Sequence, residues 1–281
     1  MVNQILIMKK TVLITGASSG IGKAAAKEFA ANNWNVIATM RNPEKEKELS
    51  KIEHILVTEL DVEKADTISH AIENGIRQFG NIDVLINNAG MGLFGVFETT
   101  PEEKIRKLFE TNVFGTMNVT RAILPHFRKQ KNGMIVNITS STGLFTIPLL
   151  SVYSATKYAL EGFSESLSFE LSPQNIKVKL IEPGMVESNF DDTTMKNYAA
   201  NPDITEYNDY LEKMIQFFSS ESSGAQKVTA EEAAEAIYSA VTDESNTLRY
   251  IIGKDVETMM GMRRSMPDQE YMEMMWKRFA V

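Results

Sequence analysis

The sequence contains no cysteine and only three histidines among its 281 residues. Without cysteine, the chain has neither a disulfide framework nor thiolate chemistry. The histidines, His54, His70 and His126, are scattered and form no zinc-binding spacing. We therefore expect neither a disulfide scaffold nor a metal centre.

Long apolar runs and an excess of positive charge are also missing. No run of about 18 apolar residues occurs, so no membrane span is predicted. The formal net charge of −8 argues against general binding of nucleic acid. Residues 1–8 are too short and too lightly charged for a secretory signal, and residues 1–9 are predicted to be a leader. These absences favour a cytoplasmic protein without nucleic-acid or membrane contacts.

A glycine-rich turn follows the first β-branched run. Residues 11–15 predict a strand, which runs into the sequence GASSGIG at residues 16–22. Gly16 permits a tight turn, Gly20 lets the backbone approach a pyrophosphate, and Gly22 lets the following helix pack closely on the sheet. A phosphate would then lie at the N-terminus of that helix, predicted over residues 21–32. The alternative is an ordinary glycine-rich turn between a strand and a helix.

Tyr153 precedes Lys157 by four residues in a segment with a helical pattern. This spacing puts the phenol and the ammonium on one helix face. A neighbouring cation favours the phenolate and lowers the pKa of tyrosine towards the working range of a general acid or base. The alternative is a solvated face with a snorkelling lysine.

Two further buried-strand patterns end in small polar residues. Residues 84–86 run into the sequence NNAG, and residues 133–138 run into the sequence TSS. The carboxyl ends of strands in an open parallel sheet are where ligands bind. Amides and hydroxyls at these ends are therefore well placed to contact a cofactor.

Taken together, these motifs resemble the short-chain dehydrogenase/reductase family in its classical form. The resemblance covers residues 10–190 and rests on the Thr-Gly-x-x-x-Gly-Ile-Gly loop, the Asn-Asn-Ala-Gly strand end, the Tyr-x-x-x-Lys pair and a serine thirteen residues before that tyrosine. It implies a single-domain Rossmann-type α/β fold over residues 10–281, a doubly wound parallel sheet with helices on both faces. The alternation of strand and helix patterns along the chain leads to the same expectation.

The resemblance also implies catalytic roles. Tyr153 would protonate a substrate oxygen during carbonyl reduction, or act as the base in the reverse oxidation. Lys157 would lower the pKa of Tyr153 and bond the nicotinamide ribose. Ser140 would hold the carbonyl oxygen, with Ser141 as the adjacent alternative.

Asn112 matches the fourth catalytic residue of the family. It lies in a helical pattern over residues 101–129, where it would support a water linking the lysine to solvent. Its alternative role is that of a polar residue that bends or caps a helix.

Cofactor choice is expected at the end of the second strand, in residues 35–42. An acidic residue there would accept bonds from the adenosine ribose, whereas arginine would pair with a 2′-phosphate. Met40 stands where the NAD-type acid is expected, and Arg41 follows. NADP(H) is therefore favoured over NAD(H), unless Arg41 is only a solvated loop charge.

Further cofactor contacts follow from the family pattern. They include a Pro-Gly pair beside the nicotinamide and, at Ser188, a serine in place of the usual threonine. Asp61, with Val62, resembles the position that contacts adenine; its alternative role is that of a helix N-cap. The predicted contacts are Gly16, Ser18, Ser19, Gly20, Ile21, Gly22, Arg41, Asp61, Val62, Asn88, Ala89, Gly90, Tyr153, Lys157, Pro183, Gly184, Val186 and Ser188. The substrate is expected to face apolar residues, with Leu144, Phe145, Leu149 and Met185 as pocket candidates.

Three other segments carry expectations. Residues 191–227 are predicted to be a substrate lid, with a loop at residues 219–226. Residues 254–281 are predicted to form a methionine-rich helical extension that serves as a substrate gate, a subunit contact or core packing. Glu161, Glu165 and Glu170 are predicted to lie on a solvated face of the helix that carries Tyr153, which in this family often packs against a second subunit in a homodimer or homotetramer.

The sequence thus predicts an NADP(H)-dependent oxidoreductase acting on CH–OH donors, a carbonyl reductase that transfers a hydride between nicotinamide and a hydrophobic carbonyl or secondary alcohol. One alternative is an NAD-linked alcohol dehydrogenase or an epimerase of the same fold. A second alternative is a non-enzymatic dinucleotide sensor or scaffold. Sensors of this fold usually lack part of the catalytic set, which is complete here.

Overall fold

A computed structural model describes the protein over residues 9–187, 194, 197–199, 201–224 and 227–279. Its strands are β1 (Thr11–Ile14), β2 (Asn35–Met40), β3 (Ile55–Glu59), β4 (Val84–Asn87), β5 (Gly133–Ile138), β6 (Ile176–Pro183), β7 (Val186–Glu187), β8 (Val228–Thr229) and β9 (Arg249–Ile252). Its helices are α1 (Gly20–Ala31), α2 (Ala65–Phe79), α3 (Glu102–Phe109), α4 (Gly115–Gln130), α5 (Ser151–Leu171), α7 (Asn208–Gly224), α8 (Ala230–Thr242), α9 (Lys254–Ser265) and α10 (Asp268–Arg278). Ser188, a predicted cofactor contact, lies outside the described residues.

The described strands form a large parallel sheet and a separate two-stranded pair, β7 with β8. Its seven strands run in the order β3-β2-β1-β4-β5-β6-β9, and β1 pairs with β2 on one side and β4 on the other. The strand order therefore reverses between β1 and β4. In open α/β sheets the ligand crevice lies at such a reversal, outside the carboxyl ends of the strands.

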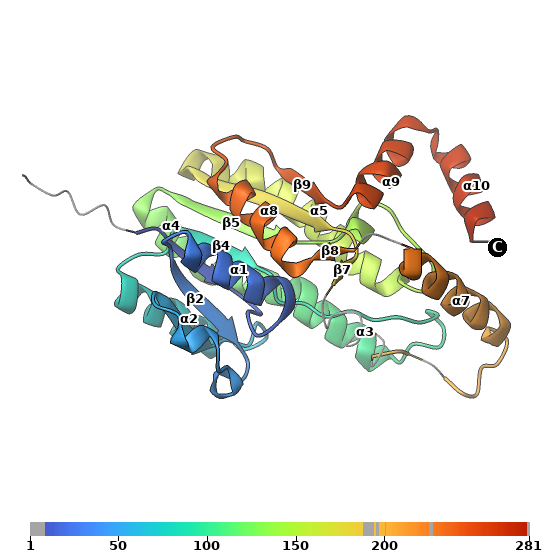
Figure 1. The fold of residues 1–281 in the computed structure, drawn as a ribbon, viewed down its shortest axis with the longest axis horizontal. Coiled ribbons are helices and arrows are strands. Elements are labelled where there is room, and N and C mark those ends of the chain that lie inside the picture. Colours follow the sequence, from blue (N-terminus) through green and yellow to red (C-terminus); the bar gives the residue numbers. More distant parts are fainter. Residues whose placement is uncertain (1–8, 188–193, 195–196, 200, 225–226, 280–281) are drawn as a thin grey trace, which may run out of the picture.

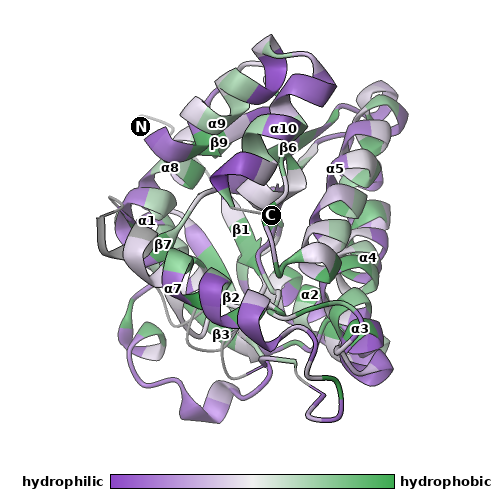
Figure 2. Cartoon of the chain, turned by 90° about the vertical axis from the view of Figure 1, so that its right-hand side faces the viewer, coloured by the Kyte–Doolittle hydropathy of each residue, from purple (hydrophilic) through white to green (hydrophobic). Residues whose placement is uncertain are grey.

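Helices cover both faces of the sheet because successive strand residues point to opposite sides. Val12 and Ile14 pack on the side of α1 and α8, whereas Leu13 packs on the side of α2, α4 and α5. Figures 1 and 2 show these two helical layers on opposite sides of the strands. The architecture is the predicted doubly wound α/β fold.

The helix predicted over residues 101–129 is not regular along its length. A π-helical segment, Glu110–Phe114, separates α3 from α4, and Asn112 lies inside it. The side-chain amide of Asn112 bonds to the backbone of Met91, outside the helix. The predicted stretch is helical, with the π segment inside it, and π segments of this kind are frequent at functional sites.

The loop predicted at residues 219–226 is wrong where the structure describes it. Helix α7 continues to Gly224, and the hydroxyls of Ser219 and Ser220 donate to Ile215 O and Phe217 O of the preceding turn. Serine therefore satisfies its hydroxyl within the helix instead of ending it. Residues 225–226 lie outside the described residues.

Helices α7, α9 and α10 lie together at the right-hand end of the molecule in Figure 1. They share one apolar cluster, in which Met214, Met260 and Met275 are buried. These methionines thus pack as core residues. Within the described ranges, no helix has both the length and the apolar character needed to cross a membrane.

Candidate active site

The glycine-rich turn after β1 has the backbone conformation that its glycines predict. Gly16 has φ +68° and Gly20 has φ +52°, backbone angles that residues other than glycine rarely adopt. Ser18 and Ser19 are exposed, and Ser19, the N-cap residue of α1, makes no side-chain cap bond. The first turn of α1 contains no acidic residue. Its backbone N–H groups are therefore available to an anion.

Asn88 clamps this turn to the end of β4. Its Nδ2 donates to Thr15 O (2.9 Å) and Gly16 O (3.1 Å), and its backbone N–H donates to Thr15 Oγ1 (3.0 Å). A Cβ added to Gly22 would lie 2.4 Å from Asn88 Nδ2, and one added to Gly16 would lie 2.9 Å from Ala89 Cα. The packing therefore leaves no room for a side chain at Gly16 or Gly22. This glycine-rich cradle, residues 16–22, is compatible with the close backbone approach that the pyrophosphate of a dinucleotide needs.

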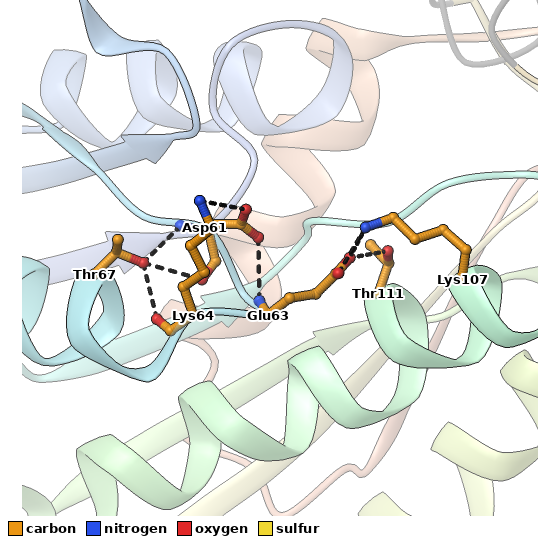
Figure 3. A network of polar contacts seen from close by, with 6 residues as sticks. All are labelled: Asp61, Glu63, Lys64, Thr67, Lys107 and Thr111. Atoms are coloured by element: carbon orange, nitrogen blue, oxygen red, sulfur yellow. Dashed lines mark hydrogen bonds and ion pairs between the residues drawn. The ribbon is translucent and has the colours of Figure 1, made fainter.

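A polar network fixes the loop after β3, as Figure 3 shows. Glu63 accepts bonds from Lys107 Nζ (2.6 and 2.7 Å) and Thr111 Oγ1 (2.6 Å), which ties the loop to the helix carrying the π segment. Burial would raise the pKa of Glu63, but the bonds from Lys107 and Thr111 hold it below its usual value.

Asp61 accepts the N–H of Glu63. The N-cap of α2 is Lys64, so the helix N-cap alternative for Asp61 was wrong.

A cavity of about 210 Å³ lies between the glycine-rich turn and the end of β2. Its lining contains Ser18, Lys23, Met40, Asn42, Lys45, Glu46, Lys47 and Glu48. Lys23 forms ion pairs with Glu46 (3.4 Å) and Glu48 (3.0 Å), so both carboxylates already face a cation. Lys45 adds positive charge to the same cavity. The sequence analysis named Arg41 and not Lys45. Acidic and basic residues alternate around Lys45, so the sequence alone does not show which of these charges pair.

Tyr153 and Lys157 lie on one side of α5, and both are only 7% exposed. Lys157 Nζ is 5.6 Å from the centroid of the Tyr153 ring and donates to Ile138 O (3.2 Å). Burial lowers the pKa of Lys157 to about 8, against the opposing charge of Glu161. The helix therefore brings a buried, titratable ammonium next to the phenol, as the spacing predicts.

Ser140 is the N-cap of a short 3₁₀ turn, Ser141–Gly143, directly after β5. Its Oγ accepts bonds from Thr142 N (3.2 Å) and Thr142 Oγ1 (3.1 Å). Gly143 packs against α5, where an added Cβ would lie 3.3 Å from Lys157 Cβ. The turn thus holds Ser140 against the helix of Tyr153 and Lys157.

Asn112 joins three elements of the site. Its Oδ1 accepts the N–H of Met91, and its Nδ2 donates to Met91 O (2.9 Å) and Thr156 Oγ1 (3.2 Å). Thr156 in turn donates to Tyr153 O (2.7 Å). Asn112 makes these bonds from within the π segment, with its amide directed at residues outside its own helix.

The predicted substrate residues divide into two groups. Phe145 and Leu149 are buried in the cluster of α7, α9 and α10, and Leu144 packs against it. Met185 is 37% exposed and lies outside that cluster. The predicted Pro-Gly pair, Pro183 and Gly184, is tied to the sheet. Pro183 is the last residue of β6, and Gly184 N donates to Ile252 O of β9.

The prediction of a solvated glutamate face on α5 was wrong for Glu161. Glu165 and Glu170 are exposed, but Glu161 is only 6% exposed. It lies one helical turn after Lys157, against Gly143, with its Cγ 3.2 Å from the position of an added Cβ there. No pattern in the sequence distinguishes it from the other two glutamates, because its burial depends on β6 and β9.

The fold and the glycine-rich cradle define a Rossmann-type α/β protein. The sequence model of the family described as short chain dehydrogenase matches residues 10–199, which is more than half of the chain. The chain therefore belongs to the short-chain dehydrogenase/reductase family, and it is an oxidoreductase.

Relatives with curated names agree with this family. An uncharacterized oxidoreductase of Schizosaccharomyces pombe is 41% identical over 83% of this chain and 96% of its own. The 3-ketodihydrosphingosine reductase of Bacteroides thetaiotaomicron is 41% identical over 64% of this chain and 65% of its own. Human retinol dehydrogenase 8 is 38% identical over 65% of this chain and 60% of its own.

Solved structures extend the similarity to most of the fold. A short-chain dehydrogenase from Streptomyces avermitilis has a TM-score of 0.78 and 33% identity, and the match covers 97% of both chains. ElxO with NADP bound has a TM-score of 0.71 and 32% identity over 87% of this chain and 98% of its own. A 3-ketoacyl-(acyl-carrier-protein) reductase from Brucella melitensis complexed with NADH has a TM-score of 0.73 and 25% identity over 87% of this chain and 96% of its own.

Proposed function

We propose that the protein interconverts hydrophobic carbonyl compounds and secondary alcohols with NADP(H), with Tyr153 as the acid and base. The observation that carries the proposal is the buried Lys157 ammonium, with its Nζ 5.6 Å from the Tyr153 ring centroid. Burying a lysine ammonium costs free energy, and groups with such a shifted pKa cluster at functional sites. The oxidoreductase family of the chain supports the same reaction class.

In this mechanism the nicotinamide supplies or accepts the hydride. The hydroxyl of Ser140 donates to the substrate oxygen and stabilises the negative charge that develops on it. Tyr153 donates its phenol proton to that oxygen in the reducing direction and takes it back in the oxidising direction. Lys157 stabilises the phenolate by its charge, and Asn112 holds Thr156 and the turn of α5 that carries Tyr153.

The proposed preference for NADP(H) rests on the positive charge at the end of β2. Arg41 is exposed directly after β2, and its charge contributes to the lowered pKa of Glu63, after burial and the larger effects of Lys107 and Thr111. Lys45 lines the neighbouring cavity, whose carboxylates are paired with Lys23. A 2′-phosphate in that cavity would meet Lys45, with Arg41 between the lining residues Met40 and Asn42 in the sequence, whereas a free ribose would gain little from either charge.

We expect Arg41→Ala and Lys45→Ala each to weaken NADPH binding by about 10- to 100-fold, the value of one charge-assisted hydrogen bond. Binding of NADH should change by less than about threefold, because it lacks the phosphate that these side chains contact. Titrations followed by nicotinamide fluorescence measure both constants. Arg77→Ala, which removes an exposed cation on α2, is the matched control. Equal affinity for both nucleotides in all three variants would contradict the 2′-phosphate assignment and favour NAD-linked alcohol oxidation.

The proposed substrate class is apolar. Leu144, Phe145 and Leu149 follow Ser140 in the sequence and join the apolar cluster formed by α7, α9 and α10, so apolar side chains follow the proposed oxygen-binding serine. Two relatives are named for 3-ketodihydrosphingosine and retinol, both largely apolar molecules.

The proposed function is tested by a panel of ketones of increasing chain length, with NADPH oxidation followed by absorbance. We expect kcat/KM to rise with chain length by about 3- to 4-fold for each buried methylene, the effect of about 0.8 kcal/mol. Tight NADPH binding without oxidation by any ketone or aldehyde would instead favour the sensor or scaffold. Interconversion of two alcohol stereoisomers without net oxidation of NADPH would favour the epimerase.

A further inference from the structure

Three glutamates converge on one arginine behind the proposed catalytic lysine. Arg249 of β9 donates through Nε to Glu161 Oε2 (3.0 Å) and through Nη2 to Glu165 Oε2 (2.5 Å). The same Nε lies 3.4 Å from Oε1 of Glu182 on β6. Glu182 is 0% exposed and Glu161 is 6% exposed, whereas Glu165 is open to solvent.

The buried pair has more acceptor oxygens than donors to satisfy them. Oε1 of Glu161 and both oxygens of Glu182 are buried and accept no hydrogen bond in the described part of the chain. Buried carboxylate oxygens without donors are costly, and two buried carboxylates cannot both stay ionised beside one shared guanidinium. A single proton bound between them removes one charge and supplies the missing hydrogen bond.

The charges on the surrounding elements are few. Besides Arg249, helix α9 carries Arg264, whose charge acts weakly on Glu182, and Arg263, whose charge acts on Tyr158 of α5. Burial and the charge of Glu161 outweigh both arginines at Glu182 and raise its pKa to about 8. The basic groups that face the pair therefore leave one carboxyl protonated at neutral pH.

The pair also acts on Lys157. Glu161 lies one helical turn after Lys157, and its charge opposes the effect of burial on the lysine pKa. Gly143 packs against both residues, with an added Cβ only 3.2 Å from Glu161 Cγ and 3.3 Å from Lys157 Cβ. Glu161 and Lys157 therefore both pack closely against the same turn.

We propose that Glu161 and Glu182 share one proton at neutral pH and that this acid pair controls the charge of Lys157. When the proton leaves in alkaline solution, the pair gains a negative charge and holds the lysine in its cationic form. Glu161 and Glu182 are thus positioning residues that extend the pH range in which Lys157 can support Tyr153. Only this last consequence rests on the proposed function; the shared proton does not.

The shared proton is tested by the stability of Glu182→Gln against pH, without cofactor or substrate. Glutamine cannot ionise, yet it can still donate to Glu161. The pKa of Glu182 is near 4.5 when unfolded and about 8 when folded, so its protonation stabilises the wild type fully below 4.5 and is lost as pH rises to 8. The melting temperature of Glu182→Gln minus that of wild type should therefore rise between pH 4.5 and 8 and level off above.

Glu165→Gln is the matched control, because Glu165 contacts the same arginine from the exposed side. Its melting temperature should follow that of wild type without this rise. A flat difference for Glu182→Gln would overturn the shared proton. If that variant does not fold, the infrared band of a protonated carboxyl group decides in the wild type, where it should be present at pH 6 and absent at pH 10.

The effect on Lys157 is tested by the pH profile of kcat. Glu161→Gln removes the charge nearest the lysine, so the alkaline loss of activity should begin about one pH unit lower than in wild type. Glu182→Gln should shift the same limb downward by a smaller amount, and Glu165→Gln should leave it in place. An unshifted limb in Glu161→Gln would overturn the control of Lys157. A protein without any turnover would sink the proposed function, while the melting and infrared measurements would still report on the shared proton.

Discussion

Replacement of Tyr153 by phenylalanine is expected to lower kcat by about 10²- to 10⁴-fold, the value of a positioned general acid. The variant loses only the hydroxyl, and the ring keeps its packing against Leu93, Leu108 and Val152 in a buried cluster. The fold and the glycine-rich cradle should therefore be unchanged. Steady-state turnover with NADPH and a long-chain ketone measures the loss, and fluorescence titration shows that NADPH still binds.

Tyr158→Phe is the matched control, because it makes the same chemical change one residue after Lys157. Tyr158 is 44% exposed and is not part of the buried cluster around Tyr153. Its replacement should change kcat by less than about twofold, well under 1 kcal/mol of barrier. Turnover in Tyr153→Phe within tenfold of wild type would contradict the proposed acid and return Ser140 or a bound water to consideration.

Gly22→Ala is expected to damage both the fold and the cofactor site. The new Cβ would lie 2.4 Å from Asn88 Nδ2 and 2.5 Å from Gly16 O, so Asn88 would have to leave its two carbonyl acceptors. Overpacking costs about 1–3 kcal/mol, and an abandoned buried hydrogen bond costs a similar amount. We expect the free energy of unfolding to fall by about 2–4 kcal/mol, measured by urea denaturation without cofactor.

The affinity for NADPH should fall in the same variant by more than about tenfold, because the displaced Asn88 no longer fixes the turn. Gly261→Ala in α9 is the control, since an added Cβ there meets nothing within 4 Å. It should stabilise the protein by up to about 1 kcal/mol through helix propensity and leave NADPH binding unchanged. Equal stability of Gly22→Ala and wild type would show that the turn can relax around a methyl group.

The sequence by itself determined the features that depend on neighbours along the chain. The alternation of strands and helices, the glycine turn at residues 16–22 and the Tyr153–Lys157 spacing are local, because dihedral preference and helix periodicity act over a few residues. The order of the strands in the sheet, with its reversal between β1 and β4, came from the structure. These local features predicted the fold class and the Tyr153–Lys157 pair, whereas Ser140 and Asn112 were named from the family resemblance.

Only the tertiary structure decided which polar groups lose contact with water and which charges meet. Asn112 lies in a π turn, and its amide bonds to Met91, which is 21 residues away in the sequence. Glu161 is buried whereas Glu165, one helical turn later, is exposed, although Arg249 of β9 bonds to both. Burial and ion pairing depend on residues distant in sequence, and a hydrophobicity pattern does not record which distant residue will arrive.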